Sequence, residues 1–243
     1  MRTIIIGDVH GCVEELHALV SKVGYQKGVD RLVSLGDLVD KGPSPAQTVA
    51  LMREIGAEMI LGNHEERMLR WLAHEDKRKL TGKVNPMSVS EEQAAEWLSL
   101  SAEDVEWLRG APVTLDLGSN TLAVHGGMLP GIPVDKQKAG TMLRLRYLTA
   151  EGKFAAIGAD CEMPEGACEW QARYDGEFNL VVGHAVHSLD APRVDRLPNG
   201  RVIHNLDTGC VHGGKLTALI LQTGEYVQVQ AAREYHPRKG GGE

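Results

Sequence analysis

The sequence is poor in aromatic residues, cysteine pairs and long apolar runs. Aromatic side chains make up 5% of its 243 residues, so a core must rely on Leu, Val, Ile, Ala and Met. Its four cysteines form no C-x-x-C pair, and a chain of this length needs no disulfides, so we expect a reducing cytoplasmic setting. No apolar stretch approaches the ~18 residues of a membrane span, and we expect neither a membrane segment nor a signal peptide.

The sequence also lacks an excess of basic residues over acidic ones. The chain has 26 Lys and Arg against 33 Asp and Glu, which gives a net charge of −7. Nonspecific nucleic-acid binding needs clustered basic residues, so we do not expect it. A phosphorylated substrate stays possible, because bound metal ions would reverse the local field.

Strand and helix patterns alternate in the first third of the chain. Short apolar runs at 4–6, 31–35 and 57–61 predict buried strands, and helices are predicted at 13–23, 44–53 and 65–73. Ser44 can cap the second helix, with Pro45 at its first position. This alternation favours a parallel α/β sheet, in which ligands gather at the carboxyl ends of the strands.

Residues 75–110 are polar and lack strand signals. Two helices are predicted there, with capping patterns that begin at Ser90 and Ser101. This helical insertion is either a specificity element near the mouth of a site or a packing pair with no substrate contact.

The second half of the chain predicts strands. Two of them, at 121–124 and 179–182, end at His125 and His184. Hairpins are predicted around the turns at 198–200 and 223–224, whereas 131–177 is weakly patterned. We expect one domain over 1–235 and a flexible tail at 236–243.

Five short segments place an oxygen or imidazole ligand beside a glycine. They are Gly7 to Gly11, Gly36 to Asp40, Gly62 to Glu65, His125 to Gly127, and Gly183-His184. Such ligands suit Mn²⁺, Fe, Co²⁺ or Zn²⁺. Three protein ligands per ion leave open positions, as in catalytic sites.

The residue types suggest a role for each side chain. Asp8 and His10 can hold one ion, and Asp37 can bridge two ions with its two oxygens. Asn63 offers a neutral carbonyl ligand. His125 and His184 can complete the second ion, whereas Asp40 can orient a neighbouring histidine.

The order of these motifs resembles the calcineurin-like metallophosphoesterase superfamily, in particular its phosphoprotein-phosphatase branch. The stretches 36–43, 61–65, 125–133, 142–148 and 207–218 are most similar to ApaH-like phosphatases, which are relatives of the symmetrical bis(5'-nucleosyl)-tetraphosphatases. The resemblance implies a four-layer α/β/β/α sandwich and two divalent metal ions, with Mn²⁺ preferred and Fe, Co²⁺ or Zn²⁺ as alternatives.

The resemblance also implies catalytic roles. One ion would be held by Asp8, His10 and Asp37, and the other by Asp37, Asn63, His125 and His184. A water or hydroxide that bridges the ions would attack phosphorus in line. His64, held by Asp40, would protonate the leaving oxygen.

Protein phosphatases of this branch carry Arg at the positions of Lys41 and often of Leu61. An ammonium grips phosphate less specifically than a guanidinium does, so the phosphate clamp looks weak for a protein substrate. Arg173 could match the remaining phosphate arginine, and Arg144 and Arg146 could reach the outer phosphates of a longer chain.

The expected function is therefore symmetrical hydrolysis of dinucleoside polyphosphates, such as diadenosine tetraphosphate to two ADP. Capped nucleotides and inorganic polyphosphate are related possibilities. The alternatives are a Ser/Thr protein phosphatase that acts on phosphoproteins, and a metal-bearing binding protein without catalysis.

Overall fold

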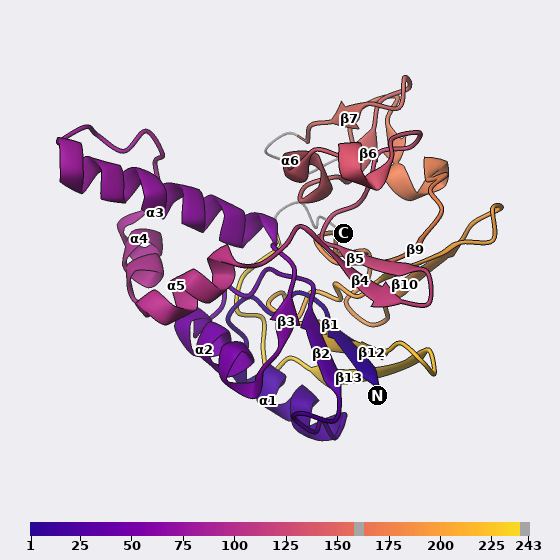
Figure 1. The fold of residues 1–243 in the computed structure, drawn as a ribbon, viewed down its shortest axis with the longest axis horizontal. Helices are drawn as coiled ribbons and strands as arrows, with labels where there is room; N and C mark the ends of the chain where they lie inside the picture. The colour runs from indigo at the N-terminus through magenta and orange to yellow at the C-terminus, as the bar shows by residue number, and fades with distance from the viewer. Residues whose placement is uncertain (158–162, 239–243) are drawn as a thin grey trace.

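The computed structural model describes residues 1–157 and 163–238, and two five-stranded sheets form the centre of this part of the chain (Figure 1). The first sheet has the order β13-β12-β1-β2-β3. Its strands are β1 (Thr3–Ile6), β2 (Arg31–Ser34), β3 (Glu58–Met59), β12 (Lys215–Ile220) and β13 (Glu225–Gln230). Strands β1, β2 and β3 are parallel, as the sequence predicts, and β12 pairs antiparallel with β1.

The second sheet is also mixed, with the order β10-β11-β9-β5-β4. Its strands are β4 (Thr114–Gly118), β5 (Thr121–Val124), β9 (Asn179–Val182), β10 (Arg193–Arg196) and β11 (Val202–Asn205). Strands β5, β9 and β11 are parallel, and β4 and β10 run antiparallel at the two edges. Both predicted hairpins are present, as β10–β11 and β12–β13.

Alternation along the strands divides the core into layers. In β1, Ile5 packs between the two sheets with Val181 of β9, whereas Ile4 and Ile6 point to the opposite face and pack under the helices. A third apolar cluster, which includes Leu180 of β9, covers the outer face of the second sheet. The predicted four-layer α/β/β/α arrangement is therefore confirmed.

Short elements, rather than long helices, make up the layer outside the second sheet (Figure 1). They are the 3₁₀ turns η1 (Val134–Lys136) and η2 (Trp170–Arg173), the helix α6 (Ala139–Met142), and a small sheet of β6 (Tyr147–Leu148), β7 (Phe154–Ala155) and β8 (Cys168–Glu169). The sequence analysis found only weak patterning in 131–177, because two-residue strands are too short to show a period.

Five longer helices lie on the other side of the first sheet, with α1 against β12 and β13, and α4 and α5 packed on α2 (Figure 1). They are α1 (Val13–Lys22), α2 (Pro45–Ile55), α3 (Asn63–Thr81), α4 (Glu91–Leu98) and α5 (Ala102–Arg109). Helix α2 begins at Pro45 as predicted, but the Ser44 side chain makes no capping hydrogen bond; the Ser44 N–H instead donates to the carbonyl of Gly11.

Helix α3 is longer than the predicted 65–73. No helix-breaking residue interrupts the sequence until Gly82, which ends the helix with a left-handed φ of 71°. Residues 75–81, which the sequence analysis assigned to the insertion, therefore continue α3.

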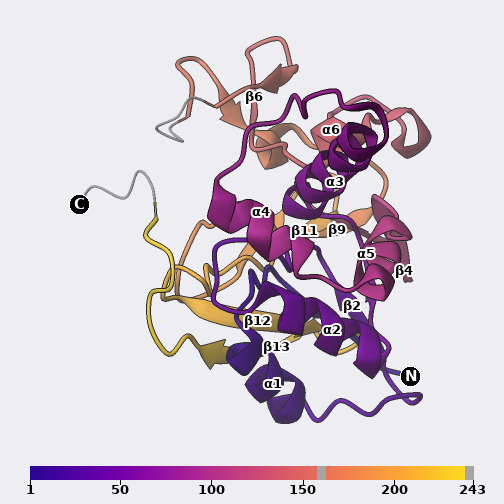
Figure 2. The same cartoon turned by 90° about the vertical axis from the view of Figure 1, so that its left-hand side faces the viewer.

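The two predicted helices of the insertion are present as α4 and α5. The hydroxyls of Ser90 and Ser101 accept hydrogen bonds from the N–H groups of Gln93 and Asp104, as the capping patterns predict. Figure 2 shows α4 and α5 lying beside α2 and α3.

In the described part of the predicted tail, His236 N–H donates to the carbonyl of Val211, and the Arg238 guanidinium donates to the carbonyl of Val186. Residues 239–243 lie outside the described ranges. Within those ranges, no helix combines the length and the apolar character needed to cross a membrane.

Candidate metal centre

The residues predicted to bind metal lie in loops at the carboxyl ends of strands. Asp8 and His10 follow β1, Asp37 follows β2, and His125 and His184 follow β5 and β9. Backbone φ is positive at His10 (47°), Asp37 (52°) and His184 (68°), a region that residues other than glycine rarely adopt. Such strain persists only where the surroundings impose it, and it is common at functional sites.

Two glycines allow the loops to approach one another closely. A Cβ on Gly183 would lie 2.1 Å from Asp8 Oδ1, and one on Gly62 would lie 2.3 Å from Asp37 Oδ1. Any larger residue would therefore displace one of the predicted metal-binding carboxylates. This explains why the ligand motifs contain glycine.

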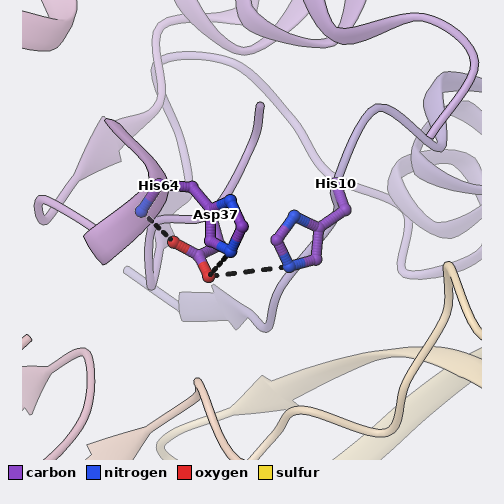
Figure 3. A group of neighbouring side chains, drawn as sticks. All are labelled: His10, Asp37 and His64. Carbon is purple, nitrogen blue, oxygen red and sulfur yellow. Dashed lines mark hydrogen bonds and ion pairs between the residues drawn. The ribbon is translucent and has the colours of Figure 1, made fainter. Parts of the chain in front are cut away.

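Asp37 lies at the centre of the cluster and is 2% exposed. Its Oδ2 is 3.3 Å from His125 Nε2, 3.5 Å from His10 Nε2 and 3.9 Å from His64 Nε2. Figure 3 shows the rings of His10 and His64 directed at the Asp37 carboxylate.

Two groups of possible ligand atoms share Asp37. One consists of His10, Asp37 and His64, and the other of Asp37, His125 and His184, with the ligand atoms of each group within 4.8 Å of one another. A carboxylate common to two three-residue groups fits two neighbouring cations. The first group contains His64 where the sequence analysis assigned Asp8, whose carboxylate accepts a hydrogen bond from His184 N at 3.0 Å.

Backbone carbonyls orient two of the histidines that were predicted to bind metal. Nδ1 of His10 lies 2.9 Å from the carbonyl of Val39, and Nδ1 of His125 lies 2.7 Å from the carbonyl of Leu35. With Nδ1–H donating to a carbonyl, the neutral imidazole would offer the Nε2 lone pair to a cation, as in most histidine metal sites. Nε2 of His125 also lies 3.0 Å from Asn63 Oδ1.

Positively charged groups already face the imidazole nitrogens. Lys41 Nζ lies 2.8 Å from His10 Nε2, and Arg146 Nε lies 3.1 Å from His184 Nε2. The Nε2 atoms of His10 and His184 therefore each face a position that a cationic group already occupies, which a metal cation would also favour. The mixed oxygen and nitrogen donors fit a divalent transition metal ion.

The buried ionisable groups of the cluster shift one another's pKa values, and a bound cation would displace protons from them. Burial raises the pKa of Asp8 well above its ordinary value, and the nearby charge of Asp207 raises it further. Burial opposes ionisation of Asp37 too, but His125 and His64 hold its pKa well below the ordinary value. Burial would lower the pKa of His125, yet Asp37 raises it to about 10.

His64 and Asp40 form the predicted pair. His64 Nδ1 lies 2.5 Å from Asp40 Oδ2, and the second oxygen, Oδ1, accepts a 2.6 Å hydrogen bond from Trp97 Nε1. Burial acts to raise the pKa of Asp40, but the hydrogen bonds of His64 and Trp97 outweigh it and lower the pKa. The pair therefore holds an ionised carboxylate beside the imidazole.

Glu65 is a functional residue that the sequence analysis left without a role. It is fully buried, and its carboxylate accepts hydrogen bonds from the N–H groups of Asp37 (2.8 Å), Leu38 (2.7 Å), Val39 (3.1 Å) and Gly62 (3.1 Å). It thereby fixes the loop that presents Asp37. The position of Glu65 directly after Asn63-His64, within a ligand motif, was the sequence signal that could have indicated a role for it.

A cleft of about 870 Å³ opens over the cluster, lined by residues that include Asp8, His10, His64 and His184. Of the predicted phosphate-binding residues, Lys41 and Arg146 line it. Arg144 and Arg173 are not among its lining residues: Arg144 pairs with Glu66 of α3, and Arg173 Nη1 donates to the carbonyl of Ala150. Helix α4 contributes Gln93 and Glu96 to the lining of this cleft.

This fold and this cluster define a metal-dependent phosphoesterase. The chain belongs to the calcineurin-like phosphoesterase family, whose model matches residues 1–188. It is a hydrolase that is similar to the bis(5'-nucleosyl)-tetraphosphatases.

The similarity to individual relatives extends over nearly the whole chain. The chain is 31% identical to the symmetrical bis(5'-nucleosyl)-tetraphosphatase of Chromohalobacter salexigens, over 93% of this chain and 97% of the relative. It is 30% identical to the asymmetrical bis(5'-nucleosyl)-tetraphosphatase PrpE of Oceanobacillus iheyensis, over 98% and 96%. A crystal structure provisionally described as a diadenosine tetraphosphatase superposes with a TM-score of 0.76 at 27% identity, covering 95% of this chain and 93% of its own.

Proposed function

We propose that this protein hydrolyses dinucleoside polyphosphates, with symmetrical cleavage of diadenosine tetraphosphate to two ADP as the leading reaction. The observation that carries the proposal is the cleft over the two ligand groups that share Asp37, in a chain similar over its full length to bis(5'-nucleosyl)-tetraphosphatases. We further propose one domain over 1–235, a cytoplasmic location and Mn²⁺ as the preferred ion.

Two metal ions would be held by the predicted ligands Asp8, His10, Asp37, Asn63, His125 and His184. When bound, they would supply an acidified water as nucleophile and neutralise charge on the phosphoryl group. The fit rests on the shared carboxylate and the inward Nε2 atoms of His10 and His125.

The side chains around these ligands have separate tasks. Lys41 and Arg146, which line the cleft, would bind non-bridging phosphate oxygens and orient the substrate. His64 would donate the proton of its Nε2 to the leaving oxygen, and Asp40 would stabilise the charged imidazole through Nδ1. Arg144 would reach the outer phosphates, and Arg173 would bind phosphate, as predicted, by exchanging their present partners, Glu66 and the carbonyl of Ala150, for phosphate oxygens.

Asymmetrical cleavage to ATP and AMP is a second candidate, favoured by the 30% identity to the relative named as asymmetrical. The two reactions differ in which phosphorus is attacked, and therefore in how far the polyphosphate chain extends past the metal centre. A Ser/Thr protein phosphatase is less favoured, because Lys41 is a single-point phosphate ligand.

Product analysis tests the proposal. Metal-stripped enzyme reloaded with Mn²⁺ is incubated with diadenosine tetraphosphate and, separately, with a phosphothreonine peptide, and the products are separated by ion-exchange chromatography. We expect two ADP and slow peptide turnover. ATP with AMP would replace symmetrical by asymmetrical cleavage, whereas rapid peptide dephosphorylation with intact nucleotide would overturn the proposal.

A further inference from the structure

Helix α4 touches the predicted acid–base pair directly. Trp97 Nε1 donates to Asp40 Oδ1 at 2.6 Å, while Asp40 Oδ2 faces His64 Nδ1 at 2.5 Å. The two oxygens of one carboxylate are thus divided between the imidazole and an indole from the helical insertion. If the indole were absent, Asp40 could rotate and would no longer hold the ring of His64 in one orientation.

The indole itself has little freedom to move. Trp97 is fully buried, and its ring meets Trp71 edge-on at 5.5 Å between centroids. The guanidinium of Arg67 lies 5.7 Å from the ring centroid, within the range of a cation–π contact. A donor held by packing on both sides fixes its acceptor more precisely than a flexible polar side chain does.

Glu96, the residue before Trp97, adds a backbone contact. Its Oε1 accepts a 3.1 Å hydrogen bond from the N–H of Asp40, a residue with φ of 68°. Helix α4 therefore holds both the main chain and the side chain of Asp40. The same helix lines the substrate cleft through Gln93 and Glu96.

We propose that Trp97 is a positioning residue for proton donation by His64, acting through Asp40, and that Glu96 supports it. This inference rests on the proposed function, in which His64 protonates the leaving oxygen. It gives the helical insertion a catalytic task in addition to forming a wall of the cleft.

A leaving-group series separates this role from a structural one. Phenyl phosphate releases a phenol with a pKa of ~10 and needs a proton donor. The nitro group of p-nitrophenyl phosphate makes its phenol more acidic and reduces that need. A defect in proton donation should therefore reduce kcat for phenyl phosphate far more than kcat for p-nitrophenyl phosphate.

We expect Trp97→Phe, which keeps an aromatic ring but loses the N–H, to lower kcat for phenyl phosphate roughly tenfold or more. We expect KM, metal content and turnover of p-nitrophenyl phosphate to change little. Trp97→His, which restores a ring N–H, should recover part of the loss. Trp71→Phe is the matched control, because it perturbs the same aromatic contact without touching Asp40.

Equal losses on both substrates, or identical behaviour of Trp97→Phe and Trp71→Phe, would overturn the inference. His64→Asn is the reference variant. If its loss of kcat is also the same for both leaving groups, His64 is not the general acid. In that case the proposed function has failed, and not only the role of Trp97. Should Trp97→Phe not fold, Glu96→Ala at the half-exposed neighbour tests the same claim, with the same expected selectivity and the same contradicting result.

Discussion

At the scale of single residues, the site depends on hydrogen bonds that assign each side chain one orientation. His10 and His125 use Nδ1 for backbone carbonyls and direct Nε2 toward Asp37. His64 instead directs Nδ1 toward a carboxylate, Asp40. Asp40 orients His64 through Nδ1, so Nε2 of His64 can present a proton to a substrate, whereas a carbonyl at Nδ1 leaves Nε2 of the other two histidines for a metal ion.

Replacing His64 tests this division. We expect His64→Asn to lower kcat for a substrate with a poor leaving group by roughly 10²–10⁴-fold, the usual contribution of a positioned proton donor. Metal content, measured by inductively coupled plasma mass spectrometry, should stay at the wild-type value. His17→Asn, at an exposed position of α1, is the control and should leave both quantities unchanged.

Glu65 allows a prediction about stability. In Glu65→Gln the amide oxygen can still accept from two of the four backbone N–H groups, but the –NH₂ faces the other two, and a buried unsatisfied donor costs about 1–3 kcal/mol. We expect the free energy of unfolding of metal-free protein to fall by about 2–5 kcal/mol in urea titrations. Glu66→Gln, on the partly exposed neighbour, should change it by about 1 kcal/mol or less; equal effects would contradict the assigned role.

At the scale of elements, local signals in the sequence predicted the strands and turns that neighbouring residues determine. The strands β1, β2, β5 and β9 and the glycine-flanked ligands after them were all predicted, because apolar runs and turn residues are close in sequence. Contacts between distant segments had no such local signal, and the family resemblance implied only those among the ligand motifs and between His64 and Asp40. Nothing in the sequence near Trp97 indicates that its indole reaches Asp40, 57 residues away.

Helix α5 is fixed to α2 by a pair that should respond to pH. Arg53 Nε lies 2.7 Å from Asp104 Oδ1, and Ser101 Oγ donates to the same carboxylate. Burial acts to raise the pKa of Asp104, but Ser101 and Arg53 outweigh it and lower the pKa below the ordinary value. A lowered pKa means that this pair stabilises the fold above the pKa of unfolded Asp, ~3.9, and that the contribution is lost as pH falls through the folded-state pKa.

We expect Asp104→Asn to lower the free energy of unfolding by about 1 kcal/mol at pH 7. The difference from wild type should shrink as the pH falls below about 4, because the wild-type carboxylate then becomes protonated. Urea titrations of both metal-free proteins at several pH values measure this. A difference that is constant from pH 7 to acid pH would contradict the assignment.

At the scale of the whole molecule, the candidate metal centre lies between loops of the two sheets. Asp8 and Asp37 follow strands of the first sheet, whereas His125 and His184 follow strands of the second. Ions held between them would cross-link the two central layers, so binding should stabilise the fold as a unit. A ligand that binds only the folded state adds about 2.7 kcal/mol at a hundred times its Kd.

We therefore expect Mn²⁺ to raise the Tm of metal-stripped protein by several degrees in thermal shift assays. Asp37→Asn should abolish most of this shift, because Asp37 belongs to both ligand groups. Asp190→Asn, whose side chain is 83% exposed, is the control and should keep it. An unchanged shift in Asp37→Asn would show that the stabilising ion binds elsewhere.

Metal stoichiometry measured together with activity tests the dinuclear site most directly. Metal-stripped protein is titrated with Mn²⁺ while bound metal and hydrolysis of diadenosine tetraphosphate are followed in the same samples. The shared Asp37 predicts that activity reaches its maximum near two equivalents of bound metal per chain, and that Asp37→Asn stays inactive at every addition. Full activity at one equivalent, or an active Asp37→Asn enzyme, would contradict the two-metal account.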